Sequence, residues 1–152
     1  MRVIKDFDEL SSVVGQEIGV SDWLTVGQDR IDRFAEATGD HQWIHVDVDR
    51  AANEMPGGRT IAHGYLTLSL VPVMIAGIFR IDGVRQSLNY GSNRVRFIQP
   101  VTAGARLRGR YRLVQARPVK DGGMQIAGEV TVELEGASRP ACVAEIMAVL
   151  YR

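Results

Sequence analysis

The sequence has almost no cysteine, no excess of either charge and no recognisable export signal. Cys142 is its only cysteine, which excludes an intrachain disulfide and a metal site made of thiolates alone. Lys+Arg and Asp+Glu number 18 each, so we expect no nucleic-acid partner, because such binding needs a net basic surface. Residues 1–9 contain no long apolar core. We therefore expect a protein of the cytoplasm, where thiols stay reduced.

The chain also lacks internal repeats, charge blocks and low-complexity linkers. Its 152 residues suffice for one domain of ordinary size and are too few for two. A content of 45% hydrophobic and 24% charged residues is typical of globular proteins. We predict a single domain over residues 1–152 that folds without a disulfide or a metal.

The most apolar stretch, Gly64–Phe79, is too short for a membrane span. A spanning helix needs about 20 apolar residues, and this run is interrupted by Pro72 and by the hydroxyl groups of Thr67 and Ser69. A helix that is apolar on all sides can instead be buried by the protein's own sheet. We predict such a buried helix, bent or broken at Pro72, because proline lacks a backbone donor.

The first 60 residues predict helices and one strand. Ile31, Phe34 and Ala35 share one face of a helix over 28–38, and Gly39 can end that helix in the left-handed conformation. The other elements expected here are a helix at 7–14, a strand at 18–24, a polar loop at 40–46 and a short helix capped by Asp47.

After residue 82 the apolar period changes to two, which indicates strands. We expect strands at 93–97, 105–116, 124–134 and 141–150, the middle two forming a hairpin around Lys120–Gly123. The last is apolar on both faces, so we place it inside the sheet. Helices followed by strands predict an α+β fold in which an antiparallel sheet wraps one buried helix.

Alternate arginines along the expected strand 105–116 form a basic stripe, which fits either a phosphate-binding surface or a solvated sheet face. A hairpin register that opposes Arg108 to Glu135 and Arg110 to Glu133 also opposes Leu113 to Val130 on the other face. We therefore predict that acidic partners cancel most of this charge. The arginines of the stripe are Arg106, Arg108, Arg110 and Arg112.

Several kinds of site are not indicated. No glycine-rich phosphate loop and no nucleophilic serine turn is present, and Cys142 lies in an apolar strand that predicts an inert thiol. His41 and His45 are four residues apart, which suits a metal only on a helix. Because Gly39 ends the preceding helix, we predict a loop there and no metal.

Asp40 and His45 suggest acid–base chemistry. A carboxylate beside an imidazole can hold one water between them, and such catalysis contributes roughly 10²–10⁴-fold to a rate. The alternative is an ordinary capped and solvated loop.

Gly64 opens the buried helix, whose first backbone N–H groups have no partner within the helix. Its N–H can donate to a carbonyl oxygen that becomes negative during a reaction. The alternative is that this glycine only permits close packing.

Phe34–His45, read as Phe-Ala-Glu-Ala-Thr-Gly-Asp-His-Gln-Trp-Ile-His with Ala51 following, resembles the signature of the R-specific enoyl-CoA hydratases. This MaoC-like or hydratase-2 group carries Gly-Asp-x-Asn-Pro-aliphatic-His. Ile61–Gly64 before the apolar helix and the strand at 93–101 resemble its next landmarks. Gln42 and Trp43 replace the family's Asn-Pro, and we expect Trp43 to reshape the acyl pocket.

The resemblance implies a hot-dog fold, a curved antiparallel sheet around a long central helix, in a homodimer whose sheets join edge to edge. It implies that Asp40 and His45 activate a water and that Gly64 binds the thioester carbonyl. The reaction implied is the reversible syn hydration of trans-2-enoyl-CoA to (R)-3-hydroxyacyl-CoA in fatty acid metabolism. No cofactor is expected beyond the CoA of the substrate.

Three other functions fit the same resemblance. The chain could be a 3-hydroxyacyl-thioester dehydratase of fatty acid synthesis, a thioesterase, or a non-catalytic acyl-CoA-binding partner subunit. The intact set of Asp40, His45 and Gly64 favours a catalytic chain.

Overall fold

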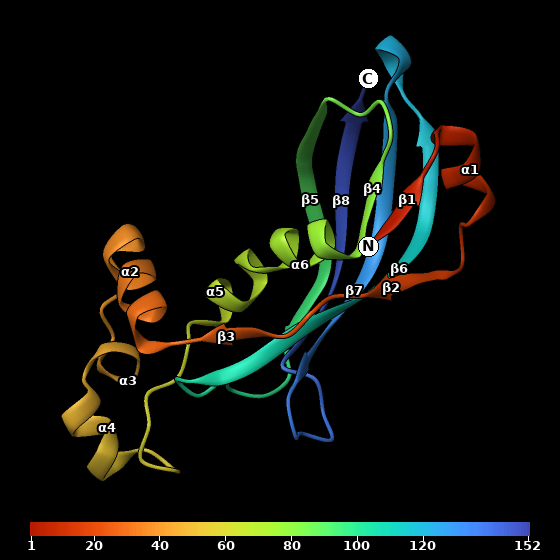
Figure 1. Ribbon diagram of the computed structural model, residues 1–152. Helices are drawn as coiled ribbons and strands as arrows, with labels where there is room; N and C mark the ends of the chain where they lie inside the picture. The colour runs from red at the N-terminus through yellow and green to blue at the C-terminus, as the bar shows by residue number, and fades with distance from the viewer.

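The computed structural model describes residues 1–152 and is dominated by one long, curved antiparallel sheet (Figure 1). The strand order is β2-β6-β7-β8-β5, and β3 extends the β2 edge by also pairing with β6. These strands are β2 (Glu17–Val20), β3 (Leu24–Val26), β5 (Gln86–Phe97), β6 (Ala105–Pro118), β7 (Met124–Leu134) and β8 (Cys142–Tyr151). The predicted α+β fold is confirmed, and the last strand lies inside the sheet as expected.

The apolar stretch forms two consecutive helices that cross one face of the sheet (Figure 1). These are α5 (Gly64–Ser69) and α6 (Val71–Ile78), separated at Leu70. The predicted break is confirmed: Pro72 lies in the first turn of α6, where its missing N–H leaves no helical bond unmade. Phe79 already belongs to β4 (Phe79–Ile81), which pairs in parallel with β1 (Arg2–Ile4). No helix is long and apolar enough to cross a membrane.

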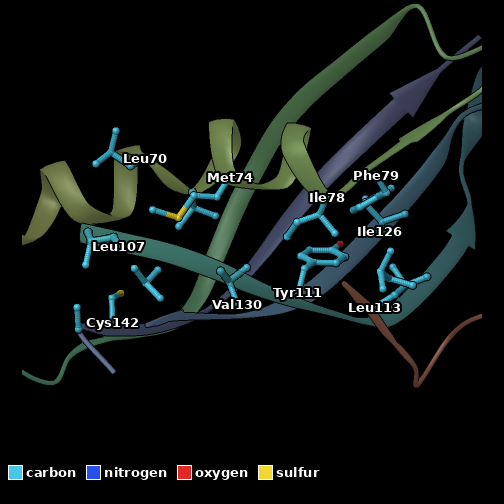
Figure 2. Packing of buried hydrophobic residues seen from close by; sticks show 14 of the residues in the cluster. Leu70, Met74, Ile78, Phe79, Leu107, Tyr111, Leu113, Ile126, Val130 and Cys142 are labelled. Atoms are coloured by element: carbon cyan, nitrogen blue, oxygen red, sulfur yellow. The ribbon is translucent and has the colours of Figure 1, made fainter. Parts of the chain in front are cut away.

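The core lies between α6 and the sheet (Figure 2). Met74 and Ile78 face the buried side chains of Tyr111 and Val130. Tyr111 is 1% exposed, and Phe79 packs against it with ring centroids 5.1 Å apart. The Tyr111 ring covers Gly128 so closely that a Cβ at residue 128 would overlap it. The core therefore depends on a large ring that fits over a residue without a side chain.

In the N-terminal half the predicted helix end at Gly39 and the predicted cap at Asp47 are confirmed, and two other predictions are wrong. It contains α1 (Phe7–Ser12), α2 (Gln28–Thr38), α3 (Trp43–Val46) and α4 (Val48–Glu54). Gly39 ends α2 at φ 76°, and the Asp47 carboxylate accepts from the Arg50 N–H at 3.0 Å, both as predicted. The predicted loop at 40–46 is wrong in part, because α3 forms one turn within it.

The predicted strand at 18–24 is wrong as a single strand. Residues 21–23 separate β2 from β3. Here the Ser21 hydroxyl, and not its carbonyl, accepts the Gly109 N–H at 2.9 Å, while the Ser21 N–H donates to the Gly109 carbonyl at 2.8 Å. β5 is longer than predicted and starts at Gln86. Its first half lies on an exposed sheet edge, and its alternate apolar side chains, Leu88 and Tyr90, are only two and are exposed, too weak a pattern to predict a strand.

The predicted register of the β6–β7 hairpin is wrong by two residues from Leu107 to Leu113 and by one from Gln115 to Pro118, although Arg108 and Tyr111 lie on the predicted faces. Arg108 lies opposite Glu133, and Tyr111 opposite Val130. The turn pairs Pro118 with Met124, and a register shift between Leu113 and Gln115 moves the ladder once more. A two-residue offset preserves each face of a strand.

Most of the charge of the basic stripe is balanced, as predicted, with a changed partner for Arg108, while Arg112 donates to the Gly15 carbonyl at 3.0 Å and forms no ion pair. Glu133 accepts from Arg108 at 2.6 Å and from Arg110 at 2.9 Å, while Glu17 also binds Arg110. Arg106 binds Glu135 at 2.8 Å.

Cys142 is fully buried, as predicted. Burial raises the pKa of its thiol to about 11, so the reactive thiolate is scarce near neutral pH.

We predict that Gly128→Ala destabilises the protein, while the same change at Gly77 does not. The new methyl group at residue 128 must displace the Tyr111 ring, an overpacking cost of about 1–3 kcal/mol. At Gly77 in α6 the nearest atom is 4.0 Å away, so alanine gains up to about 1 kcal/mol from its helix propensity. Urea unfolding of both variants measures the difference, and equal effects would contradict this account of the core.

We also predict that Glu133 stabilises the fold at neutral pH and not in acid. Desolvation acts to raise the pKa of Glu133, but hydrogen bonds from Arg108 and Arg110 outweigh it and hold the pKa below its ordinary value of 4.5. Because the folded-state pKa is depressed, the contribution is complete above the unfolded pKa of about 4.3 and is lost as pH falls through the folded one.

The measurement is urea unfolding of wild type and Glu133→Gln at neutral and at acidic pH. The variant should lose up to about 1 kcal/mol at pH 7, and the difference should shrink on acidification well below about pH 4. Glu135→Gln, which removes the partner of Arg106 alone, serves as the control with a smaller loss. A Glu133 effect that persists undiminished in acid would contradict the assignment.

Candidate active site

Asp40, His45 and His63 converge beside the start of α5 from three separate elements. Asp40 follows the glycine that ends α2, His45 lies in α3, and His63 is the residue before α5. A carboxylate oxygen of Asp40 and one ring nitrogen of each histidine lie within 4.8 Å of one another. Figure 1 shows α2, α3 and α4 grouped at one end of the molecule, near α5. The structure therefore brings together the predicted pair, Asp40 and His45, and adds His63 to it.

His45 is buried, and the backbone around it defines its tautomer. Its Nδ1 lies 2.6 Å from the carbonyl oxygen of Ile61. A carbonyl can only accept, so Nδ1 carries the proton and Nε2 of the neutral ring is an acceptor. The Ile61 N–H donates in turn to the Ile44 carbonyl at 3.0 Å. Two hydrogen bonds thus join α3 to the segment that leads into α5.

Gln28, the first residue of α2, supports the turn that carries His45. Its side-chain amide donates to the His45 carbonyl at 2.8 Å, and its Oε1 accepts from the hydroxyl of the buried Thr60. Sequence reasoning missed this residue. A glutamine at a helix start carries no signal for a bond to a residue 17 positions away.

Asp40 is the exposed member of the group, with 57% of its side chain accessible. Its Oδ1 accepts a long hydrogen bond of 3.4 Å from the Gln42 N–H, so Gln42 contacts Asp40 through its backbone. The expectation that Trp43 reshapes the acyl pocket is wrong for the cavity beside His45. The Trp43 ring instead packs against Arg50, whose guanidinium carbon lies 4.0 Å from the ring centroid.

A pocket of about 290 Å³ lies next to His45. His45 and Gly64 both border it, and Phe97, Ile98 and Val101 contribute apolar walls. One cavity therefore contacts the buried imidazole and the first residue of α5. An apolar cavity with a few polar groups is the usual form of a small-molecule site.

Gly64 is in tight contact with the β5 side of this pocket. A Cβ at Gly64 would lie 2.9 Å from the Phe97 ring, so the glycine permits close packing. As the first residue of α5 it also has an N–H that no residue of the helix can accept. Its role as donor to a substrate carbonyl stays a prediction.

His63 is the site residue to which sequence reasoning gave no role. It is 3% exposed, and its ring stacks on His45 with centroids 3.7 Å apart and planes inclined by 24°. Its position just before Gly64, in an otherwise apolar segment, is the signal that could have found it. His41 stays outside the group: it faces Glu36 at 3.7 Å and is 54% exposed.

The geometry of the two imidazoles favours hydrogen bonding over metal binding. A tetrahedral metal needs ligand lone pairs that converge on one point. Nε2 of His63, 4.0 Å from Oδ2 of Asp40, donates its proton to the Asp40 carbonyl and so has no lone pair for a metal. One nitrogen of each ring is also engaged, His45 with Ile61 and His63 with Asp40.

Comparison with known proteins agrees with this fold. Residues 9–137 match the family described as MaoC like domain. The chain is 46% identical over 145 residues to "3-hydroxyacyl-thioester dehydratase Z" of Mycobacterium tuberculosis, covering 95% of each protein. It is 46% identical over 142 residues to "Nodulation protein N" of Rhizobium meliloti, covering 93% of this chain and 88% of that protein.

Among solved structures, the R-hydratase PhaJ1 from Pseudomonas aeruginosa superposes with a TM-score of 0.74 at 23% identity. The superposition covers 94% of this chain and 83% of that chain. The fold is thus that of the hot-dog proteins, as the resemblance implied. The chain belongs to the MaoC-like domain family, whose members include dehydratases and hydratases, the enzymes that remove or add water.

Proposed function

We propose that this protein catalyses the reversible syn hydration of trans-2-enoyl-CoA to (R)-3-hydroxyacyl-CoA. The observation that carries the proposal is the proximity of Asp40 and His45 beside a pocket that also borders Gly64. The R-hydratase among the structural neighbours supports the hydration direction. The proposed enzyme is a hydro-lyase that needs neither a metal nor a cofactor besides the CoA of its substrate.

The separation of Asp40 and His45 suits one shared water. A water with two hydrogen bonds of about 2.8 Å at a tetrahedral angle spans roughly 4.6 Å between its partners. A carboxylate oxygen of Asp40 and a ring nitrogen of His45 lie within 4.8 Å of each other. Nε2 of His45 is free to accept because Nδ1 donates to Ile61. Asp40 accepts a hydrogen bond from the second O–H of the water and orients the nucleophile.

The bond changes follow from this placement. The water oxygen bonds to C3 of the enoyl group while His45 Nε2 takes one of its protons. The C2–C3 π electrons move toward the thioester and form an enolate, whose oxygen accepts the Gly64 N–H. The proton held on His45 then passes to C2 on the same face. Water is added as OH at C3 and H at C2, which is syn addition.

We propose that the protein works as a homodimer in the cytoplasm. β5 pairs only with β8, so its outer edge is free to pair with another strand. Leu88 and Tyr90 on this strand are 46% and 63% exposed, which is unusual for side chains of their size in a monomer. Pairing of two β5 edges would join two sheets and cover these side chains.

The second candidate is the dehydration of a 3-hydroxyacyl thioester in fatty acid synthesis. The 46% identity to the mycobacterial "3-hydroxyacyl-thioester dehydratase Z" favours it. The same groups would act in reverse order, so the two candidates share one site and differ in carrier and physiological direction. Assays of both directions with CoA and acyl-carrier-protein thioesters separate them.

We predict that Asp40→Asn and His45→Gln each lower kcat for crotonyl-CoA hydration by about 10²–10⁴-fold, because each removes one partner of the water. The measurement is the loss of the conjugated enoyl-thioester absorbance, with size-exclusion chromatography to verify that assembly is unchanged. His41→Gln, on the same segment and outside the group, should keep wild-type turnover. Near-normal turnover in either site variant would reject the mechanism. A wild type inactive on crotonyl-CoA and on a longer enoyl-CoA, but releasing free thiol, would indicate a thioesterase.

The Gly64 N–H can be tested without breaking α5. Proline is tolerated at the first helical position, and His63 already has the extended backbone (φ −57°, ψ 138°) that a following proline requires. Because Phe97 would clash with any side chain at residue 64, the comparison is made in a Phe97→Ala background. In that background we expect Gly64→Pro to have a kcat about 10²–10³-fold below that of Gly64→Ala, which retains the N–H. Equal turnover of the two would exclude the proposed donor.

A further inference from the structure

The most deeply buried member of the site, His63, has no part in the proposed bond changes. It is 3% exposed, whereas the Asp40 side chain is 57% exposed and His45 borders the pocket. Because it is buried beneath these two residues, it acts only through its neighbours. Its neighbours are the two residues that are proposed to hold the water.

His63 contacts both of these residues at once. Its Nε2 donates to the backbone carbonyl of Asp40 at 2.9 Å and lies 4.0 Å from Oδ2 of the same residue. One face of the ring stacks on His45 at 3.7 Å. The Phe34 ring, from α2, lies 5.0 Å away and inclined by 54°. The next residue along the chain is Gly64.

The other ring nitrogen of His63 is buried without a hydrogen-bond partner. Buried polar atoms are nearly always paired, so an unpaired one requires an explanation. A phenylalanine would fill the same space and avoid this cost. The benefit that offsets it is the hydrogen bond from Nε2 to Asp40, which only a polar side chain can make.

We propose that His63 is a positioning residue for the water site. Its hydrogen bond to the Asp40 carbonyl attaches Asp40 to the start of α5. Its stacking sets the plane of the His45 ring. The carboxylate, the imidazole and the Gly64 N–H are thereby kept in one arrangement. This inference rests on the proposed hydration function.

Three variants separate the hydrogen bond from ring packing. His63→Phe retains a stacking ring and loses the donor. His63→Gln places an amide N–H near the position of Nε2, and His63→Asn places one nearer that of Nδ1, too short to reach Asp40. His41→Gln is the control, a histidine next to Asp40 in the sequence whose side chain faces Glu36 and lies outside the group of Asp40, His45 and His63.

In the hydration assay we expect His63→Phe and His63→Asn to lower kcat on the order of 10²-fold, the cost of misplacing a catalytic group by about 1 Å. KM should stay near the wild-type value because His63 does not touch the substrate. His63→Gln should recover most of the lost kcat. Unchanged kcat in the phenylalanine variant, or a glutamine variant as slow as the asparagine one, would overturn the proposal.

A second measurement does not depend on activity. Hydrogen–deuterium exchange of residues 39–46 should be faster in His63→Phe than in wild type and restored by His63→Gln, with far-UV circular dichroism unchanged. If the wild type is inactive on enoyl thioesters but this exchange pattern holds, the proposed function fails and the positioning role stands. If the phenylalanine variant does not fold, the glutamine and asparagine variants decide alone. Equal exchange rates of residues 39–46 in wild type and in every folded variant would contradict the positioning role of His63.

Discussion

The hydrogen bond between His45 Nδ1 and the Ile61 carbonyl is the interaction on which the rest of the site depends. It fixes the tautomer of the imidazole, so that the nitrogen left free is an acceptor. It also joins α3 to the segment that enters α5, and the Ile61 N–H strengthens the same connection through Ile44. Together with that second bond it fixes His45 relative to the segment that enters α5, although His45 and Ile61 are 16 positions apart in the sequence.

The parts of the structure that could be predicted from the sequence are those that depend on residues close together in the chain. The end of α2 at Gly39 and the start of α4 at Asp47 follow from backbone conformation and capping within a few residues. The β6–β7 register did not follow, because the shift near Val114 depends on the paired strand and not on local pattern. A face pattern with period two cannot distinguish registers that differ by two residues.

The residues of the candidate site also divide into those that could be predicted from the sequence and those that could not. Asp40 and His45 are five positions apart and lie next to a helix end, so sequence could pair them. His63 bonds to a residue 23 positions away and Gln28 to one 17 positions away, and such contacts exist only once the chain has folded. Stacking of two imidazoles has no sequence pattern of its own. The supporting residues are therefore the ones that needed a structure.

The break at Leu70 divides the apolar stretch into one helix that borders the pocket and a second that packs on the sheet. α6 provides Met74 and Ile78 to the core, whereas α5 provides Gly64 and Thr67 to the pocket and Leu66 to the core. The residues of this stretch that border the pocket therefore lie on one side of the break. A lineage could adapt the pocket at residues 64 and 67 while Leu66 and residues 71–78 preserve the fold.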